Sequence, residues 1–371
     1  MESNNTTNPQ HMSTFTENIS LFNGIFIVPT ILGILGNSLV FRTIYTWDKY
    51  YTPTYILMAN MAISDLITLV ASLAYSIASI LSWLFNASLS SWPITCRVLS
   101  YLITAFHGVS SLSLTAISYD RFNTIVQASL DQCPPFFRRK KALSIVLSSI
   151  WIAGMTLALP YPWIITIDSR LPYICEIGQI INTANLVLYS ISCLFSTFLP
   201  SLIIVILYIK VVLFIHRKWR VSSSLSAKYS KDEENKKKDV LKMLIVTTTI
   251  AIIFTLPHIF VYVIVTVFNS TLSNVIITLP LYLRYLLYFT YKFSVMACAH
   301  SPLIYSLMNR KFRHDMKITF RQSCNSSTSL NAKTSHKVGV TTVVTTCDDH
   351  VSRQNFRYLD SVEMMEKIDP L

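Results

Sequence analysis

Between residues 96 and 122 the chain reads CRVLSYLITAFHGVSSLSLTAISYDRF, an apolar run that opens on a cysteine and closes on an acid, a base and an aromatic residue. As an α-helix, the stretch from Cys96 to Arg121 would extend over roughly 37 Å. A lipid hydrocarbon core is about 30 Å thick, so this run is long enough to cross it. The pattern predicts a membrane-spanning helix with Cys96 at one edge and Arg121 at the other.

Six other stretches are also long and apolar enough to cross a bilayer as helices. They occupy residues 21–44, 55–80, 142–165, 184–214, 240–268 and 281–308, and the run quoted above is expected to extend to 126. Some of them contain proline, which a buried membrane helix tolerates because neighbouring groups satisfy the freed carbonyls. The sequence therefore predicts an all-α membrane protein with a seven-transmembrane helix bundle over residues 21–308.

The composition excludes several other classes of protein. Hydrophobic residues make up 52% of the 371 residues and charged residues 13%, whereas soluble domains carry roughly 25% charge. The net charge of +12 does not indicate nucleic-acid binding, because the basic residues lie between apolar runs and form no soluble basic face. The sequence offers no nucleophile–base pair and no metal-ligand spacing, so we expect no enzymatic activity.

Lysine and arginine accumulate in the loops on one side of the predicted bundle. Residues 138–141, 217–220, 236–238 and 310–317 are strongly basic, whereas residues 1–20, 83–94 and 269–280 contain no lysine or arginine. Basic loops stay in the cytosol during membrane insertion. We therefore expect a multi-pass membrane protein with an extracellular N-terminus and a cytosolic C-terminus.

Five N-x-S/T sequons fall on the side that the charge pattern places outside the cell. They stand at Asn4, Asn5, Asn18, Asn86 and Asn269. Such sequons are glycosylation acceptors in exposed loops of secreted or extracellular segments. The agreement between sequons and charges predicts that residues 1–20 form a glycosylated extracellular N-terminus.

Of the seven cysteines, Cys96 and Cys175 are the two expected at the outer, oxidising face. A disulfide between them would hold the loop before the fifth span over the bundle. The alternative is a pair of unpaired thiols. The remaining cysteines face the cytosol or the membrane, where we expect them to be reduced or lipidated.

Polar and ionisable residues within membrane spans are costly, so each is a candidate functional residue. Asn37 lies in the first span, Asp65 in the middle of the second, and Ser110 in the third. Asp120 and Arg121 end the third span, where a neutralised arginine that reaches toward the interface is also a common structural feature.

Together with Trp151, Pro200, Tyr208, Pro257 and the Ser301–Tyr305 segment, these residues stand at matching places in successive spans. The chain thus resembles the rhodopsin-like (class A) G-protein-coupled receptors over about residues 21–325. The resemblance implies that Arg121, beside Asp120, is the switch arginine that opens toward a heterotrimeric G protein. It also implies that Tyr208 and Tyr305 swing toward it in the active state.

The same resemblance implies a core of polar residues that holds a sodium ion in the family. Asp65 and Ser110 match this site, and Asn37 and Ser301 are the other polar core candidates. We expect no further cofactor.

The chain departs from the family pattern at several positions. Ser301 replaces the usual asparagine before the span-seven proline, Thr255 replaces the toggle tryptophan, and Lys237 replaces the acidic lock partner of Arg121. These departures keep open a receptor-fold protein that binds ligand with weak or no G-protein signalling. A transporter or channel is the other alternative, disfavoured because the sequence shows no inverted repeats.

Two comparisons within the family narrow the ligand class. Val295 stands where an opsin carries its retinal lysine, and Ile103 stands where amine receptors carry an aspartate. The short N-terminus and the segment entering span six are similar to those of peptide receptors, so a peptide or neuropeptide ligand is expected. The candidate pocket residues are Ile103, His107, Thr255, His258, Arg284, Lys292 and Val295.

Four of these pocket residues are basic or can become so, namely His107, His258, Arg284 and Lys292. Lys292 lies inside a predicted span and needs an anion or must lose its proton. A small acidic ligand would supply that anion. The alternative is that Lys292 points outward or pairs with backbone carbonyls, and that the histidines are neutral packing groups.

Beyond the bundle, residues 309–324 alternate basic and apolar side chains, which predicts an amphipathic helix on the inner membrane surface. Cys324, at the end of this segment, is a candidate palmitoylation site or an unmodified cytosolic thiol. Residues 325–371 are polar and rich in serine and threonine, so we expect a disordered cytosolic tail. Phosphorylation of this tail by receptor kinases would create an acidic arrestin-binding segment.

Overall fold

The computed structural model describes residues 9–85, 92–127, 140–167, 175–177, 183–222, 246, 249–250, 253–254, 281–308 and 310–335. Its long helices are α1 (Pro9–Thr46), α2 (Pro53–Leu84), α3 (Trp92–Phe122), α4 (Lys140–Leu157), α6 (Thr183–Cys193), α7 (Leu199–Ser222), α10 (Leu281–Met308) and α11 (Arg310–Ser335). The shorter elements are η1 (Asp48–Tyr50), η2 (Asn123–Gln127), α5 (Tyr161–Ile164), η5 (Leu194–Phe198) and the strands β1 (Ile165–Thr166) and β2 (Glu176–Ile177).

Five helical stretches among the described residues are long and apolar enough to cross a membrane. They are Asn23–Thr46, Pro53–Leu84, Trp92–Val126, Lys140–Ile164 and Val187–Phe214. These stretches coincide with the first five predicted spans, and α10 coincides with the seventh. Most of the sixth predicted span, 240–268, lies outside the described residues.

Two prolines shape the helices that contain or follow them. The fourth span was expected as one helix over 142–165, but α4 ends at Leu157 and α5 begins after a turn at residues 158–160. Proline lacks an N–H and its ring displaces the preceding carbonyl, so Pro160 interrupts the helical ladder. The π-helical η5 ends two residues before Pro200, which likewise cannot donate to the helical ladder.

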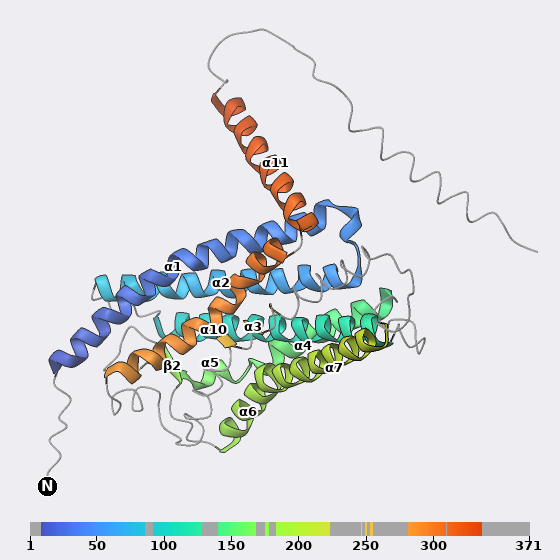
Figure 1. Cartoon of the computed structure of the whole chain (residues 1–371). Coiled ribbons are helices and arrows are strands. Elements are labelled where there is room, and N and C mark those ends of the chain that lie inside the picture. Colours follow the sequence, from blue (N-terminus) through green and yellow to red (C-terminus); the bar gives the residue numbers. More distant parts are fainter. Residues whose placement is uncertain are drawn as a thin grey trace, which may run out of the picture. The chain divides into compact units, whose positions relative to one another are not determined.

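Helix α2 packs against both α1 and α3, α3 also packs against α4 and α7, and α10 packs against α1 and α2, as Figure 1 shows. Glycines allow α1 and α10 to approach each other closely. A Cβ added to Gly33 would lie 2.7 Å from Ala299 Cβ, and one added to Gly36 would lie 2.8 Å from Pro302 Cβ. Small residues at such crossings are typical of membrane helix packing.

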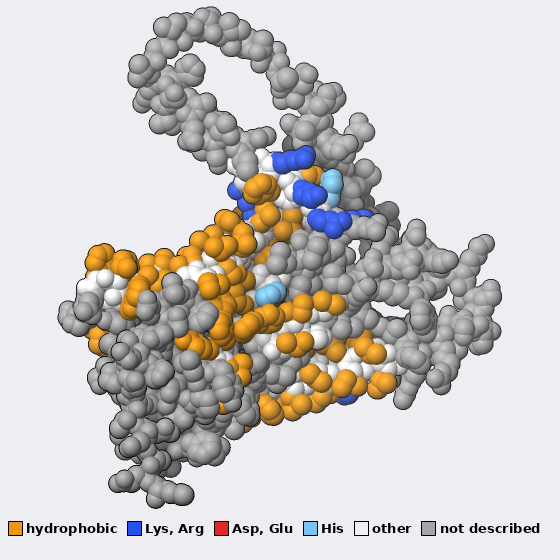
Figure 2. Space-filling model, turned by 60° about the vertical axis from the view of Figure 1, so that its left-hand side comes forward, with side chains coloured by type: hydrophobic (Ala, Val, Ile, Leu, Met, Phe, Trp, Pro, Cys, Tyr) orange, Lys and Arg blue, Asp and Glu red, His pale blue; other side chains and the backbone are white. Residues whose placement is uncertain are grey.

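The outer surface of the bundle is apolar. Leu32, Leu35, Ile145 and Ile152 are each more than 60% exposed, and Figure 2 shows hydrophobic side chains spread over the described part of one flank. Exposed apolar surface of this extent marks a lipid or protein contact. Here it follows the helices that are long enough to span a membrane.

Two buried clusters fill the bundle. One includes Leu57, Met58, Met61, Ile117, Tyr208 and Phe312, and the other includes Leu69, Tyr75, Trp92, Cys96, Tyr189 and Val295. The first cluster contains residues near the Arg121 end of α3, and the second contains residues near the Cys96 end. We call them the inner cluster and the outer cluster.

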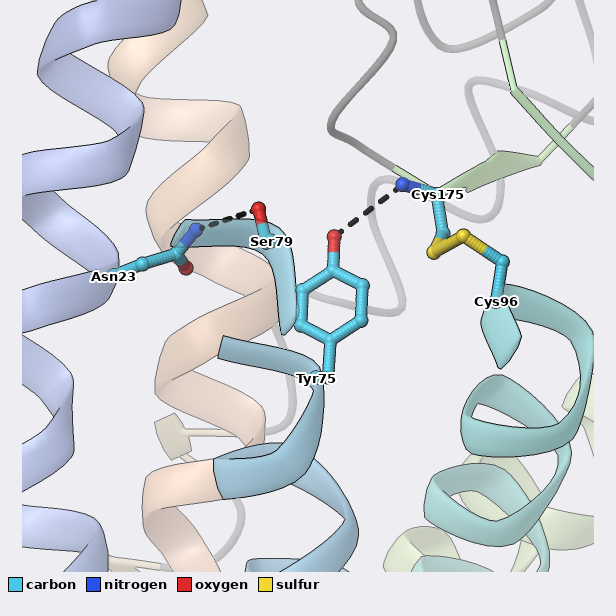
Figure 3. The surroundings of a disulfide bond; sticks show 5 residues. All are labelled: Asn23, Tyr75, Ser79, Cys96 and Cys175. Carbon is cyan, nitrogen blue, oxygen red and sulfur yellow. Dashed lines mark hydrogen bonds between the residues drawn. A yellow bond between two sulfur atoms is a disulfide. The ribbon is translucent and has the colours of Figure 1, made fainter. Parts of the chain in front are cut away.

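The loop between the fourth and fifth spans is bonded to the outer end of α3, near Cys96. Cys96 and Cys175 form a disulfide with a Cα–Cα distance of 5.6 Å (Figure 3), which confirms the predicted bond. Directly after Cys175, β2 pairs antiparallel with β1, with Ile165 opposite Ile177. A covalent bond at Cys175 and a short β-ladder at the next two residues thus hold the loop.

Candidate functional site

The inner end of α3 carries a three-residue polar unit. Arg121 donates from Nη2 to the hydroxyl of Thr54 on α2, and that hydroxyl donates to Asp120 Oδ2 at 2.5 Å. The direct distance from Arg121 Nη2 to Asp120 Oδ2 is 3.7 Å, so Thr54 bridges the acid and the base. Sequence reasoning named Asp120 and Arg121 but missed Thr54, whose short polar side chain at the start of an apolar span was the available signal.

The unit is largely withdrawn from solvent. The Asp120 side chain is 6% exposed and that of Arg121 is 18% exposed. Arg121 Nε has no hydrogen-bond acceptor among the described residues. Tyr208 on α7 is buried in the inner cluster and lies close enough to interact electrostatically with the guanidinium. The guanidinium therefore retains donors for a partner that enters from this end.

The side chains at three other positions of the switch pattern lie outside the described residues. Tyr305 lies in α10 with an undescribed side chain, and Lys237 and Thr255 are not described at all.

A second polar group lies midway along the bundle. Asp65 is fully buried, and its Oδ1 accepts a hydrogen bond of 2.6 Å from Ser110 Oγ. Its Oδ2 has no hydrogen-bond partner by geometry among the described residues, although Cys298 and Ser301 of α10 lie near the carboxylate. Asn37 donates to the carbonyls of Gly33 and Cys298, which links α1 to α10 beside this group. The four predicted core residues thus gather in one region.

Cys298 was not expected at this core. Its Sγ lies 3.9 Å from His107 Nδ1, so the predicted pocket residue His107 instead reaches the neighbourhood of Asp65. Among the described residues, no group of three or more histidine, cysteine, aspartate or glutamate side chains is arranged to hold a metal ion.

A hydrogen-bonded chain fastens α2 to α3 and α4. Trp151 Nε1 donates to Asn60 Oδ1 at 2.7 Å, and Asn60 Nδ2 donates to Ser113 Oγ at 2.8 Å. The sequence analysis singled out Trp151 but neither Asn60 nor Ser113. These bonds fix the three helices between the inner and outer ends.

Lys292 lies in the outer half of α10, where it is 1% exposed. Its Nζ donates to Ser76 Oγ at 3.0 Å and lies 4.8 Å from the centre of the Tyr75 ring. The Tyr75 hydroxyl accepts a hydrogen bond of 3.4 Å from the backbone N–H of Cys175, as Figure 3 shows. Lys292 therefore faces α2 and does not point outward.

The other predicted pocket residues are only partly placed. Ile103 and Val295 are both buried in the outer cluster. Thr255 and His258 lie outside the described residues, and Arg284 lies in α10 with an undescribed side chain.

The inner corner, between η1 and the start of α11, holds a further charged group. Asp315 Oδ2 accepts from Tyr50 OH at 2.5 Å and pairs with Lys49 Nζ at 2.6 Å. Partial burial by itself would raise the pKa of Asp315, but the hydrogen bonds from Lys49 and Tyr50 and the charge of Lys49 lower it below its usual value. Burial raises the pKa of Tyr50, and the hydrogen bond to Asp315 raises it further.

The predicted modification sites remain predictions. Asn4, Asn5, Asn86 and Asn269 lie outside the described residues, and the side chains of Asn18 in α1 and Cys324 in α11 are not described. Helix α11 runs to Ser335, past the predicted end at residue 324, so residues 325–335 of the segment expected to be disordered are helical. The association of α11 with a membrane surface stays a prediction, and residues 336–371 lie outside the described residues.

Comparisons with known proteins agree with this arrangement of helices. The family model "7 transmembrane receptor (rhodopsin family)" matches residues 36–305. The chain is 28% identical over 162 residues to the bombesin receptor subtype-3 of Ovis aries, a match that covers 42% of the chain and 38% of that receptor. It is 24% identical over 307 residues to the C-C chemokine receptor type 7 of Homo sapiens, covering 80% of the chain and 74% of the relative.

A solved structure, that of squid rhodopsin, has the same fold. The TM-score is 0.62 at 23% sequence identity, over 82% of this chain and 86% of the rhodopsin chain. The likeness extends over most of both chains and concerns the fold alone.

Proposed function

Because the chain belongs to the rhodopsin family of seven-transmembrane receptors, we propose that it binds an extracellular peptide and activates heterotrimeric G proteins in response. Members of this family are receptors of the plasma membrane and not enzymes. We propose that the N-terminus is extracellular and the C-terminus cytosolic, as the basic loops indicate. Receptor kinases and arrestin are proposed partners of the serine- and threonine-rich tail.

The proposal for signalling depends chiefly on the unit formed by Asp120, Thr54 and Arg121. The guanidinium is held inside the bundle by one hydroxyl and one carboxylate, at hydrogen-bonding and ion-pairing distance. An arginine held in this way can exchange these partners for backbone carbonyls of an entering protein segment. Tyr208 is beside it on α7 and supplies a further polar group on that path.

The proposal of a peptide ligand is supported by relatives and by two positions in the outer cluster. The matched relatives include a bombesin receptor and a chemokine receptor. Val295 cannot form a Schiff base with retinal, and Ile103 cannot form an ion pair with an amine. Both side chains are buried and apolar, so they suit an uncharged part of a ligand.

We further propose a sodium ion at the midpoint of the bundle. Asp65, Ser110 and Ser301 would hold it, because a carboxylate and two hydroxyls are oxygen ligands that suit a hard cation. The fit is supported by Asp65 Oδ2, a buried oxygen without a donor by geometry among the described residues. A bound cation would neutralise the buried carboxylate.

A receptor-fold protein that binds ligand without signalling is the competing function, since Thr255 and Lys237 depart from the family pattern. Nucleotide exchange on purified G proteins separates the two. Peptides from a library are first selected for binding to the full-length receptor, and those binders are then tested for exchange. Peptide-dependent exchange on at least one G protein supports the proposal, and binding with no exchange on any G-protein class contradicts it.

A further inference from the structure

The Lys292 side chain is a buried cation for which the described residues provide no anion. It is 1% exposed, and the ion pairs between described side chains join Lys49, Arg121 and His314 to aspartates but do not involve Lys292. Withdrawing an ammonium group from water costs several kcal/mol, even after the surroundings relax. A hydroxyl and an aromatic ring offset part of this cost but supply no counter-charge.

Asp65 is too far along the bundle to serve as the counter-ion. It lies near Ser301, which is nine residues beyond Lys292 on α10. Nine residues of α-helix correspond to about 13 Å. Asp65 is also bonded to Ser110, which keeps its carboxylate in the middle of the bundle.

The surroundings of Lys292 connect it to the extracellular loop. The Tyr75 ring lies against Nζ on one side, and its hydroxyl bonds to the backbone of Cys175, the loop residue of the disulfide. The same ring stacks with Trp92, with 6.2 Å between the ring centroids. Tyr75 therefore contacts both the loop and the ammonium, and a group that enters beside the loop must displace its buried ring to reach Lys292.

We propose that Lys292 receives the carboxylate of the extracellular ligand, an acid attached to an apolar or aromatic body. This deepens the proposed function and rests on it. The carboxylate replaces Ser76 as the partner of Nζ, which the flexible four-carbon stem of lysine permits. The hydrogen bond between Tyr75 and the loop breaks as the ring moves aside, and the apolar body of the ligand lies against Tyr75 and Trp92. A charge-assisted hydrogen bond between ammonium and carboxylate is stronger than the bond to Ser76 that it replaces.

The test uses a matched pair of probes that differ in charge and hardly at all in shape. These are N-acetyl-phenylalanine and its amide, added to the purified full-length receptor while thermal unfolding is followed. We expect the acid to raise the unfolding midpoint of the wild type in a saturable manner, because a molecule that binds the folded state stabilises it. The amide should leave the midpoint unchanged. Equal effects of acid and amide would contradict the proposal.

The variant Lys292→Met keeps the apolar stem and removes the charge. It should need at least tenfold more acid for the same shift, or about 1.4 kcal/mol. Lys210→Met is the matched control, because Lys210 is exposed near the other end of the bundle, where Nζ lies 6.0 Å from the Phe122 ring. An unchanged acid response in Lys292→Met would overturn the proposal.

A third variant covers the case in which Lys292→Met does not fold. Ser76→Ala keeps the ammonium and removes its hydroxyl partner, so the acid should bind within about threefold of wild type or more tightly. If the acid no longer raises the unfolding midpoint of Ser76→Ala, the acid binds the Ser76 hydroxyl and not the ammonium. If chloride raises the midpoint of the wild type as much as the acid does, the site binds inorganic anions. Either result overturns the proposal. No G protein is present in this assay, so its failure leaves the nucleotide-exchange test of the proposed function untouched.

Discussion

The inner and outer ends of the bundle treat a buried positive charge in opposite ways. At the inner end, Arg121 is held by Asp120 and by the bridging hydroxyl of Thr54. At the outer end, Lys292 has a hydroxyl and a ring, with no carboxylate among the described residues. Within the described part of the chain, the cation at the inner end is therefore paired, and an intracellular partner would have to release it. The described side chains give the cation at the outer end no counter-charge, which the proposed ligand carboxylate would supply.

The largest expected effect comes from removing the Cys96–Cys175 disulfide, which releases the loop at the outer end. Cys96→Ser should lower stability by up to about 4 kcal/mol, because the disulfide closes a long loop in the unfolded chain. Thermal unfolding of the detergent-purified receptor measures the loss. Cys193→Ser is the control, since Cys193 is a free cysteine. If both variants lose the same stability, the disulfide does not fix the outer end.

The second prediction concerns removal of the Arg121 guanidinium at the inner end. Arg121→Ala should reduce peptide-dependent nucleotide exchange by at least about 100-fold, or roughly 2.7 kcal/mol, and leave peptide binding intact. Arg42→Ala controls for the loss of an arginine, because Arg42 is an exposed residue near the inner end of α1. Undiminished exchange in Arg121→Ala would remove Arg121 from the switch.

The third sharpens the comparison by removing the bridge and keeping both charges. Thr54→Val is nearly isosteric and breaks the bonds to Asp120 and Arg121, each a hydrogen bond to a charged group. We expect exchange without ligand to rise by about fivefold, close to 1 kcal/mol. Thr43→Val is the matched control, since the buried Thr43 hydroxyl bonds to the Leu39 carbonyl of its own helix. Lower basal exchange in Thr54→Val would show that Thr54 does not restrain Arg121.

The smallest expected effect concerns Asp315, a second inner acid that is paired within the chain. Its folded pKa is lowered, so its contribution is present at neutral pH and is lost as the pH falls through the folded pKa, below the usual carboxyl value of about 4. Asp315→Asn should cost about 1 kcal/mol or less at pH 7, because Lys49 is half exposed and its pairing is screened.

Denaturation of wild type and Asp315→Asn at pH values from 7 down to 3 measures this difference. The two curves should converge at the acidic end. A stability gap that widens as the pH falls would mean that the pairing of Asp315 with Lys49 and Tyr50 is not stabilising.

The sequence by itself determined the spans, the family and the disulfide. Spans depend on the length and polarity of consecutive residues, which are local properties, and six of the seven coincide with described helices. The Cys96–Cys175 bond was predictable because compartment alone separates these two thiols from the other five. The departures from the family pattern at Ser301, Thr255 and Lys237 could also be found in the sequence, because each position lies a fixed number of residues from a recognisable motif residue.

The tertiary structure alone decided which side chains meet across helices. The sequence analysis did not predict four of these contacts. They join Thr54 to Asp120 and Arg121, Asn60 to Trp151, Cys298 to His107, and Ser76 to Lys292. Each contact depends on how two helices are rotated and shifted relative to each other. In a soluble helix the apolar stripe would reveal the rotation. In a membrane helix, lipid and bundle interior are both apolar, so hydrophobicity locates the helix without showing which face turns inward.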